Sequence, residues 1–366
     1  AGNNPGLQST FNDYLAALEV VPQVKALPDP QVAFSYFIQP VETRLGPQEF
    51  KFSASQMFPW FGTLGARENA AIQMAKAKYE AFEETKSSLF NEVKASYYNL
   101  YFTHKAIEIT IENLGILNTF RNIVLIKVEA GIVSAVDEYR IEIEIGDLEN
   151  QLALLRDNFL VQTVMFSNLL NVSATGTIEF PLMLHTSELV YDKNSILDSI
   201  WAQNHQLLNL DYQIGSLKYR QDVAKKSGLP NMSVGLDYIM IGQGENNLAG
   251  KDAFVFPRIG ITIPLYRNKY KAMVDEVIYL EASKQREKSD KENLLETIFE
   301  NAYRDLRDAG RRMDLYRNQL SLAEISLQIL EVEYATNSRD FEEILRMERL
   351  VLKYALEIEK ARADNE

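Results

Sequence analysis

The stretch 295–334, LETIFENAYRDLRDAGRRMDLYRNQLSLAEISLQILEVEY, carries apolar or small residues at steps that alternate between four and three. A sustained seven-residue repeat of this kind imposes left-handed supercoiling, so helices that carry it pack lengthwise on partners. The surrounding tract, from about Asn268 to Tyr334, contains no proline and would be ~100 Å long as a helix. The stretch therefore predicts a coiled-coil helix much longer than those of ordinary globular domains. The repeat positions are Leu295, Phe299, Ala302, Leu306, Ala309, Met313, Tyr316, Leu320, Ala323, Leu327, Leu330 and Tyr334.

The same pattern occurs a second time, earlier in the chain. A shift of 206 positions places most of the stripe on residues of similar character, inside another proline-free tract from about Gly62 to Glu129. Self-similarity at a fixed spacing is the signature of a repeated structural unit, so we expect the two halves to share one fold. The shifted positions are Leu89, Val93, Ser96, Leu100, Thr103, Ile107, Thr110, Leu114, Leu117, Arg121, Val124 and Val128.

A break and a return helix follow each long tract. Gly131 and Asn337 align under the same shift, and both residue types tolerate the left-handed conformation that ends a helix. Ser134 and Asp340 align as N-caps of the return helices. The sequence thus predicts two long antiparallel helical hairpins. Their tips are expected to contain Gly131, Val133, Ser134, Asn337, Ser338 and Asp340.

Two pairs of alternating segments precede the helical tracts, at about 31–58 and about 231–264, and each pair has one apolar and one polar face. Pro59 and Pro264 lie at the two strand-to-helix turns. Hairpins of roughly ten-residue strands with this alternation are typical of an outer-membrane β-barrel. Four strands cannot close a barrel, since ~8 is the practical minimum, so other copies of the chain must complete the sheet.

The predicted fold class is mainly α with β, with long antiparallel coiled-coil hairpins that form an α-barrel and four strands contributed to an oligomeric transmembrane β-barrel. Residues 1–190 form the first repeat: a short helix, a strand hairpin at about 31–58 and a helical hairpin at about 62–170. Residues 191–366 form the second, with a helix at about 194–228, strands at about 231–264 and a helical hairpin at about 268–364. The two repeats are expected to intertwine as one unit.

Composition excludes several classes of function. With 38 Lys plus Arg against 51 Asp plus Glu, the formal net charge is -13, which makes nucleic acid an unlikely partner. The chain has no cysteine, and its three histidines share no metal-ligand spacing. No P-loop, G-x-S-x-G or H-E-x-x-H motif is present. We therefore expect no enzymatic activity, no catalytic residues, no bound metal and no cofactor. No basic segment followed by an apolar core opens the chain, so we expect no signal peptide in it.

This order of strands and helices resembles the TolC-like outer-membrane efflux family over nearly the whole chain. The stretches that carry the most specific resemblance are PVETRLGPQ at 40–48 and SQMFPWFG at 55–62, which look like the heavy-metal cation efflux (CzcC/CusC-like) branch of that family. The resemblance implies a homotrimer in the outer membrane of a Gram-negative cell, with a twelve-stranded barrel continuous with a periplasmic tunnel. It also implies contact with outer-membrane lipid, a periplasmic adaptor docked on the tips, and an inner-membrane RND-type transporter. Such a channel would be a passive exit duct for metal cations or small toxic molecules, gated at the tips.

Two acids beside the tips, Asp137 and Glu343, align across the repeat. In a trimer they would place six carboxylates around one opening, which would favour cations and constrict the channel, with Arg339 as a candidate partner. The alternative is that both are ordinary acids in the first turn of a helix, where the helix dipole favours them. Two departures from the family are a short first helix and the lack of a lipid-bearing cysteine.

A second interpretation is a soluble coiled-coil scaffold, or a periplasmic adaptor without a pore. The strand pairs would then bury their apolar faces in small sheets. A chain that is monomeric and soluble without detergent would favour this alternative.

Overall fold

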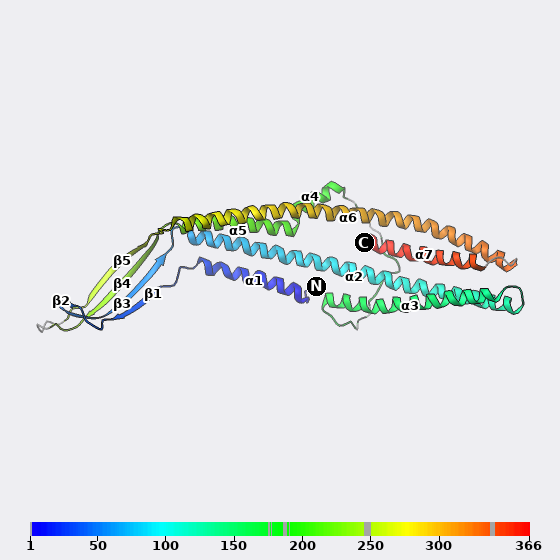
Figure 1. The fold of residues 1–366 in the computed structure, drawn as a ribbon, viewed down its shortest axis with the longest axis horizontal. Coiled ribbons are helices and arrows are strands. Elements are labelled where there is room, and N and C mark those ends of the chain that lie inside the picture. Colours follow the sequence, from blue (N-terminus) through cyan, green and yellow to red (C-terminus); the bar gives the residue numbers. More distant parts are fainter. Residues whose placement is uncertain are drawn as a thin grey trace. The chain divides into compact units, whose positions relative to one another are not determined.

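The computed structural model describes residues 2–174, 176, 178–185, 189, 191–244, 250–336 and 341–366. The chain is divided into two compact units, and each unit contains residues from both halves of the sequence. The first, unit 1, comprises Ala1–Gln8, Thr85–Ala202 and Asn293–Glu366; the second, unit 2, comprises Ser9–Glu84 and Gln203–Glu292. Figure 1 labels the elements in chain order.

Two helices have the predicted exceptional length. Helix α2 runs over Thr63–Glu129 and α6 over Arg267–Thr336, with 67 and 70 residues. The return helices are α3, Ala135–Leu170, and α7, Phe341–Asn365. Within the described residues, no helix combines the length and the apolar character expected of a membrane-crossing segment.

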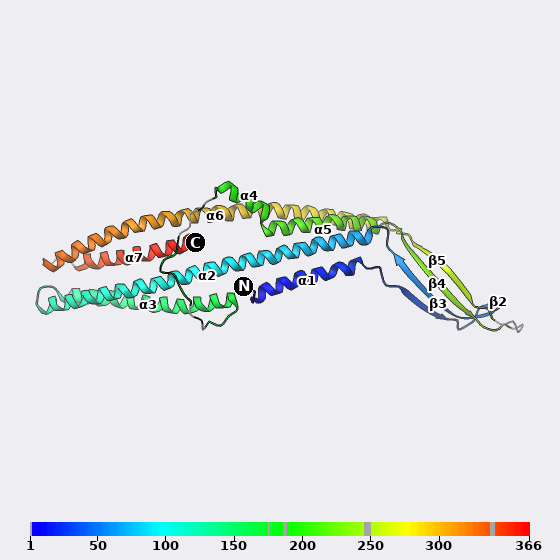
Figure 2. The same cartoon turned by 180° about the vertical axis from the view of Figure 1, so that it is seen from behind.

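The core of unit 1 lies where both helical hairpins meet. Side chains of α2, α3, α6 and α7 form one apolar cluster, and α3 contacts α7 directly. Figure 2, from behind, shows α2 beside α3 and α6 beside α7. Because seven-residue spacing brings one face of each helix to its partners, these side chains pack together and form a dry apolar core in this part of unit 1. The buried members are Leu117, Phe120, Val124, Ile141, Ile145, Leu148, Tyr334, Phe341, Ile344 and Leu345.

In unit 2, helices α1 and α5 pack against the beginning of α2, and helix α6 contacts α5. Helix α1, Pro5–Lys25, contributes Phe11, whose ring centroid lies 5.3 Å from that of Phe82 on α2. Helix α5, His205–Ser227, begins at the N-cap Asn204 and packs on α2, where the Ser216 hydroxyl donates to the Ala70 carbonyl over 2.8 Å. Helix α6 contacts α5 through Lys288 and Asp211, 2.7 Å apart.

The strands of both sequence halves form one antiparallel sheet in unit 2. Its order is β1-β3-β4-β5, with the short β2 paired to β3. The bounds are Gln31–Tyr36 for β1, Glu42–Thr43 for β2, Gly46–Phe58 for β3, Asn231–Ile241 for β4 and Ala253–Thr262 for β5. Strand β3 of the first half pairs with β4 of the second, so both hairpins share one sheet. The described residues of β1 and β5 form the two edges.

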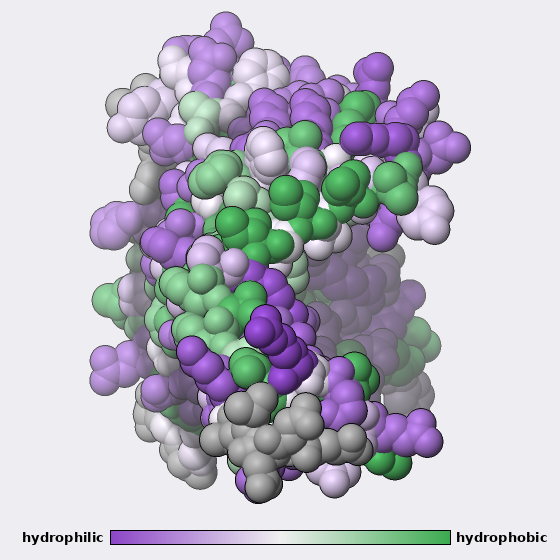
Figure 3. Space-filling view, turned by 90° about the vertical axis from the view of Figure 1, so that its left-hand side faces the viewer, coloured by the Kyte–Doolittle hydropathy of each residue, from purple (hydrophilic) through white to green (hydrophobic). Residues whose placement is uncertain are grey.

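The register assigns each side chain to one of two faces, because directly opposed residues of antiparallel strands point to the same side. Phe34 lies opposite Phe52, which lies opposite Tyr238, which lies opposite Phe254. All four are exposed. We call this the apolar face. Figure 3 views the molecule from the strand-bearing side and shows hydrophobic side chains gathered beside hydrophilic ones. The other side, the polar face, carries Ala33, Ser35, Lys51, Ser53, Ser55, Ser233, Gly235, Asp237, Arg258 and Gly260 among its residues.

The predicted fold class is confirmed in its helices and strands, and the order strands, long helix, return helix occurs twice. One detail differs. The helix expected at about 194–228 is two helices, α4 (Lys193–Gln203) and α5, because Asn204 leaves the helical conformation and its side chain accepts bonds from two following amides.

Candidate functional site at the helix tips

The tip of the first hairpin is a tight turn between α2 and α3. Gly131 has φ of 69°, the left-handed region that favours glycine, and its amide donates to the Val128 carbonyl over 2.9 Å. The next amide, of Ile132, donates to the Lys127 carbonyl over 2.9 Å, so the last carbonyls of α2 are satisfied. Ser134 caps α3 by accepting from the Val136 amide. The predicted glycine and serine roles therefore match this geometry.

The tip of the second hairpin lies between Thr336, the last residue of α6, and Phe341, the first of α7. The predicted tip residues Asn337, Ser338 and Asp340 and the predicted constriction residue Arg339 lie outside the described residues. Val133, on the first tip, packs against the core cluster of unit 1. The turn between α2 and α3 is therefore held to the core of unit 1 by the apolar side chain of Val133.

Asp137 lies in the first turn of α3 with 13% of its side chain exposed. Arg140, one turn later, places its Nη1 3.2 Å from Asp137 Oδ1. Burial, and then the nearby Asp137 carboxylate, raise the pKa of Tyr334 on α6 to about 12. Lys127 lies 4.0 Å from the centroid of the Tyr334 ring. The carboxylate of Asp137 thus lies near the Arg140 guanidinium and the buried Tyr334 side chain.

Glu343 lies in the first turn of α7 and pairs with Arg346, three residues later. The pair is the repeat counterpart of Asp137 and Arg140, since both its members are shifted by the same 206 positions. Each predicted constriction acid therefore has an arginine partner on its own helix. The charge that either acid contributes to its surroundings is partly neutralised by that partner.

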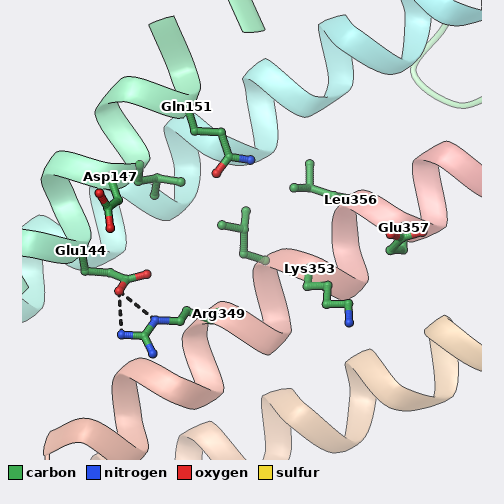
Figure 4. A pocket seen from close by; sticks show the side chains of 9 residues that line it. Glu144, Asp147, Gln151, Arg349, Lys353, Leu356 and Glu357 are labelled. Atoms are coloured by element: carbon green, nitrogen blue, oxygen red, sulfur yellow. Dashed lines mark hydrogen bonds and ion pairs between the residues drawn. The ribbon is translucent and has the colours of Figure 1, made fainter. Parts of the chain in front are cut away.

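Ion pairs between the hairpins continue from this point along α3 and α7. Arg140 Nε on α3 lies 3.6 Å from Glu342 Oε2 on α7, and Arg349 on α7 lies 2.8 Å from Glu144 on α3. Arg349 also lies 3.5 Å from Glu342 on its own helix. The Glu144–Arg349 pair stands at one end of a groove of about 340 Å³ between the two helices, into which Gln151 projects (Figure 4). The two hairpins are thus joined by charge at the surface and by apolar packing underneath.

A buried acid, Glu348, was not predicted. It is 2% exposed, accepts a hydrogen bond from Asn113 Nδ2 over 3.2 Å, and its other oxygen has no hydrogen-bond partner among the described residues. Burial raises the pKa of Glu348 to about 7, with Asn113 acting against the shift. The sequence could have indicated this buried acid. Glu348 lies one helical turn after Ile344, at a position where helical periodicity predicts an apolar residue.

The two predicted strand-to-helix prolines lie in unit 2. Pro59 follows β3, and the next amide, of Trp60, donates to Asn231 Oδ1 over 3.3 Å. Pro264 is buried after β5, and Arg267 at the start of α6 donates to the Gly228 carbonyl over 3.1 Å. Both turns are therefore tied to the beginning of β4 or the end of α5. Across the part of the chain that the structure describes, no three His, Asp or Glu side chains are grouped to hold a metal ion.

Residues 1–172 match a family model described as outer membrane efflux protein. The match is to the outer membrane efflux protein family. Its channel proteins are transport components and not enzymes, in agreement with the expectation from the motifs.

A curated relative and two solved structures extend the comparison. Toxin and drug export protein A of Aggregatibacter actinomycetemcomitans is 24% identical over 239 residues, which are 63% of this chain and 51% of that protein. The chain thus spans about half the length of this relative.

The solved structures cover nearly the whole chain. The outer-membrane channel OprN matches with a TM-score of 0.82 and 15% identity, over 100% of this chain and 85% of its own. CusC matches with a TM-score of 0.81 and 16% identity, over 99% of this chain and 86% of its own. These likenesses establish a TolC-like channel fold. Since OprN and CusC score alike, the fold does not single out the metal branch of the outer membrane efflux family.

Proposed function

We propose that the protein is the outer-membrane exit channel of a tripartite efflux pump. The observation that carries this proposal is the sheet of β1, β3, β4 and β5, which exposes one continuous apolar face and has β1 and β5 as its edges. In water, an exposed apolar face and unpaired strand edges favour aggregation. When copies of the sheet close into a barrel within lipid, the edges pair with one another and the apolar face contacts the lipid.

The assembly that suits this sheet is a homotrimer. Outer membrane efflux proteins act as trimers in tripartite pumps with adaptors and inner-membrane transporters. Three copies of four long strands would give a barrel of twelve, above the practical minimum of ~8. A periplasmic adaptor would contact the hairpin tips at Gly131, Val133 and Ser134 and at the second tip, and an RND-type transporter would deliver the cargo from the inner membrane.

The gate of the channel would lie at the tips, with Asp137 and Glu343 facing the axis. The Asp137–Arg140 and Glu343–Arg346 pairs support a charged constriction whose acids are held in place instead of repelling one another freely. Metal cations or small toxic molecules are the proposed cargo. The export of toxin and drug named for the curated relative supports the second class, and the stretches at 40–48 and 55–62 support the first.

The test begins with the full chain extracted in detergent. We expect a trimer by crosslinking and by sedimentation, and stepwise conductance when the trimer is added to planar bilayers. A chain that remains monomeric with folded helices, or that is soluble without detergent, would favour a coiled-coil scaffold instead. Deletion of the gene, followed by measurement of sensitivity to metals, dyes and detergents, would identify the cargo.

A further inference from the structure

The polar face of the sheet carries a compact group of charges. Lys51 on β3, Asp237 on β4 and Arg258 on β5 are the charged residues that the strand register places on this face. Lys51 Nζ lies 3.0 Å from one oxygen of Asp237, and Arg258 Nη1 lies 3.5 Å from the other. One carboxylate therefore holds two cations from the strands on either side of it. We call these three residues the strand triad.

The accessible members of the strand triad are its cations. The side chain of Asp237 is 8% exposed, whereas those of Lys51 and Arg258 are 31% and 43% exposed. Burial of the acid beneath two basic groups means that a solute passing over this face meets positive charge. Each copy of the chain contributes two cations and one anion here, an excess of one positive charge, although the whole chain has a net charge of -13.

The surrounding sequence makes room for this arrangement. A Cβ added at Gly235, which precedes Asp237 on the same face, would lie 3.3 Å from Arg258 Nη2 and 2.6 Å from the Ala54 carbonyl oxygen. The guanidinium thus lies across a position that has no side chain. Serine residues flank it, with Ser53 directly opposite Asp237 and Ser233 directly opposite Gly260. The register also places Ile239 and Val255 on this face, so Lys51 and Arg258 are its basic groups among small and aliphatic neighbours.

We propose that the strand triad is a specificity-determining site that favours negatively charged solutes in the strand-lined part of the channel. The inference rests on the proposed function, since it requires the polar face to line the channel. A ring of three copies would focus a positive potential in a low-dielectric surrounding, where fixed charges act strongly on permeating ions. Asp237 acts as a positioning residue, because it orients the cations and lowers their net charge.

The experiment uses the purified full chain in planar bilayers under a tenfold KCl gradient. We expect Lys51→Gln with Arg258→Gln to lower the chloride-to-potassium permeability ratio by roughly twofold or more. Asp237→Asn should raise the ratio, because it removes the anion and leaves both cations. The opposite signs distinguish a selectivity role from a purely structural one, which would alter assembly in both variants without reversing the ion preference. Arg304→Gln with Arg307→Gln, two exposed cations of α6 in unit 1, is the matched control.

The outcomes separate the two proposals. A wild-type chain that forms trimers but no conducting channel would overturn the proposed function and this inference with it. A conducting wild type whose permeability ratio is unchanged in the Lys51 and Arg258 double variant would overturn the inference alone. A control variant that shifts the ratio as far as the double variant does would also overturn it, since the effect would then be one of net charge.

Discussion

Asn113 on α2 donates a hydrogen bond to Glu348 on α7 over 3.2 Å, and both side chains are buried. The pair joins the first helical hairpin to the second at a buried position. Glu348 has one satisfied oxygen and one without a partner among the described residues. An acid in such a place is held more easily in its neutral form, because an unpaired charge pays a large desolvation penalty.

We expect Glu348→Gln to change the pH dependence of stability. Burial raises the folded-state pKa of Glu348 to about 7 from 4.5, so the unfolded chain loses its proton first as the pH rises. The contribution of Glu348 to the free energy of unfolding is therefore fully present below pH ~4.5 and is lost as the pH rises to about 7. The loss amounts to roughly 3 kcal/mol at most. Glutamine cannot ionise, so the variant should gain in melting temperature relative to wild type at pH 8 but not at pH 4.5.

Thermal unfolding in detergent at both pH values measures this effect. Glu324→Gln, an exposed acid on α6, is the control and should behave like wild type. A constant difference between Glu348→Gln and wild type at all pH values would show that Glu348 does not titrate in this range.

Core packing of the first hairpin should be sensitive to a single truncation. Ile141 is fully buried in the cluster of unit 1, whereas Ile143, two residues later on α3, is 66% exposed. Ile141→Ala leaves a cavity and should cost roughly 2–4 kcal/mol, seen as a lower denaturation midpoint. Ile143→Ala should leave the midpoint nearly unchanged in a dissociated monomer. Equal losses in both variants would contradict the assignment of the buried face.

The ion pairs between the hairpins should influence how firmly the tips are held together. Arg349→Gln removes the pair with Glu144 on α3, which joins the two hairpins, and a second pair with Glu342 within α7. Exposed pairs contribute only ~0–1 kcal/mol each, so we expect a rise in the open probability of a few-fold at most. Single-channel recording at low and high salt measures it, because screening should reduce the difference. Arg317→Gln, which loses a pair within α6 alone, should not change gating.

Neutralising the two tip acids tests the proposed constriction. We expect Asp137→Asn with Glu343→Gln to lower cation preference and to weaken block by multivalent cations in planar bilayers. Trimer assembly should persist, since the apolar seam is untouched. An unchanged reversal potential and unchanged block would assign both acids to ordinary capping and ion pairing at the start of their helices.

Much of the architecture could be predicted from local pattern. The seven-residue stripes predicted α2 and α6 to within a few residues, and Gly131 and Ser134 predicted the first tip, because periodicity and capping depend on neighbours in the chain. The break at Asn204 was missed, since a capping residue inside a helical pattern is a weak signal against the helical residues around it.

The sequence by itself therefore determined the lengths of the helices, the places where they turn and the two faces of each strand. Tertiary structure decided which strands pair and which charges meet. Asn113 and Glu348 are 235 positions apart, and Lys51 meets Asp237 only because β3 pairs with β4 in one particular register. A one-residue slip in that register would move Asp237 to the apolar face. Local periodicity contains no information on such a choice, which depends on the packing of the whole sheet.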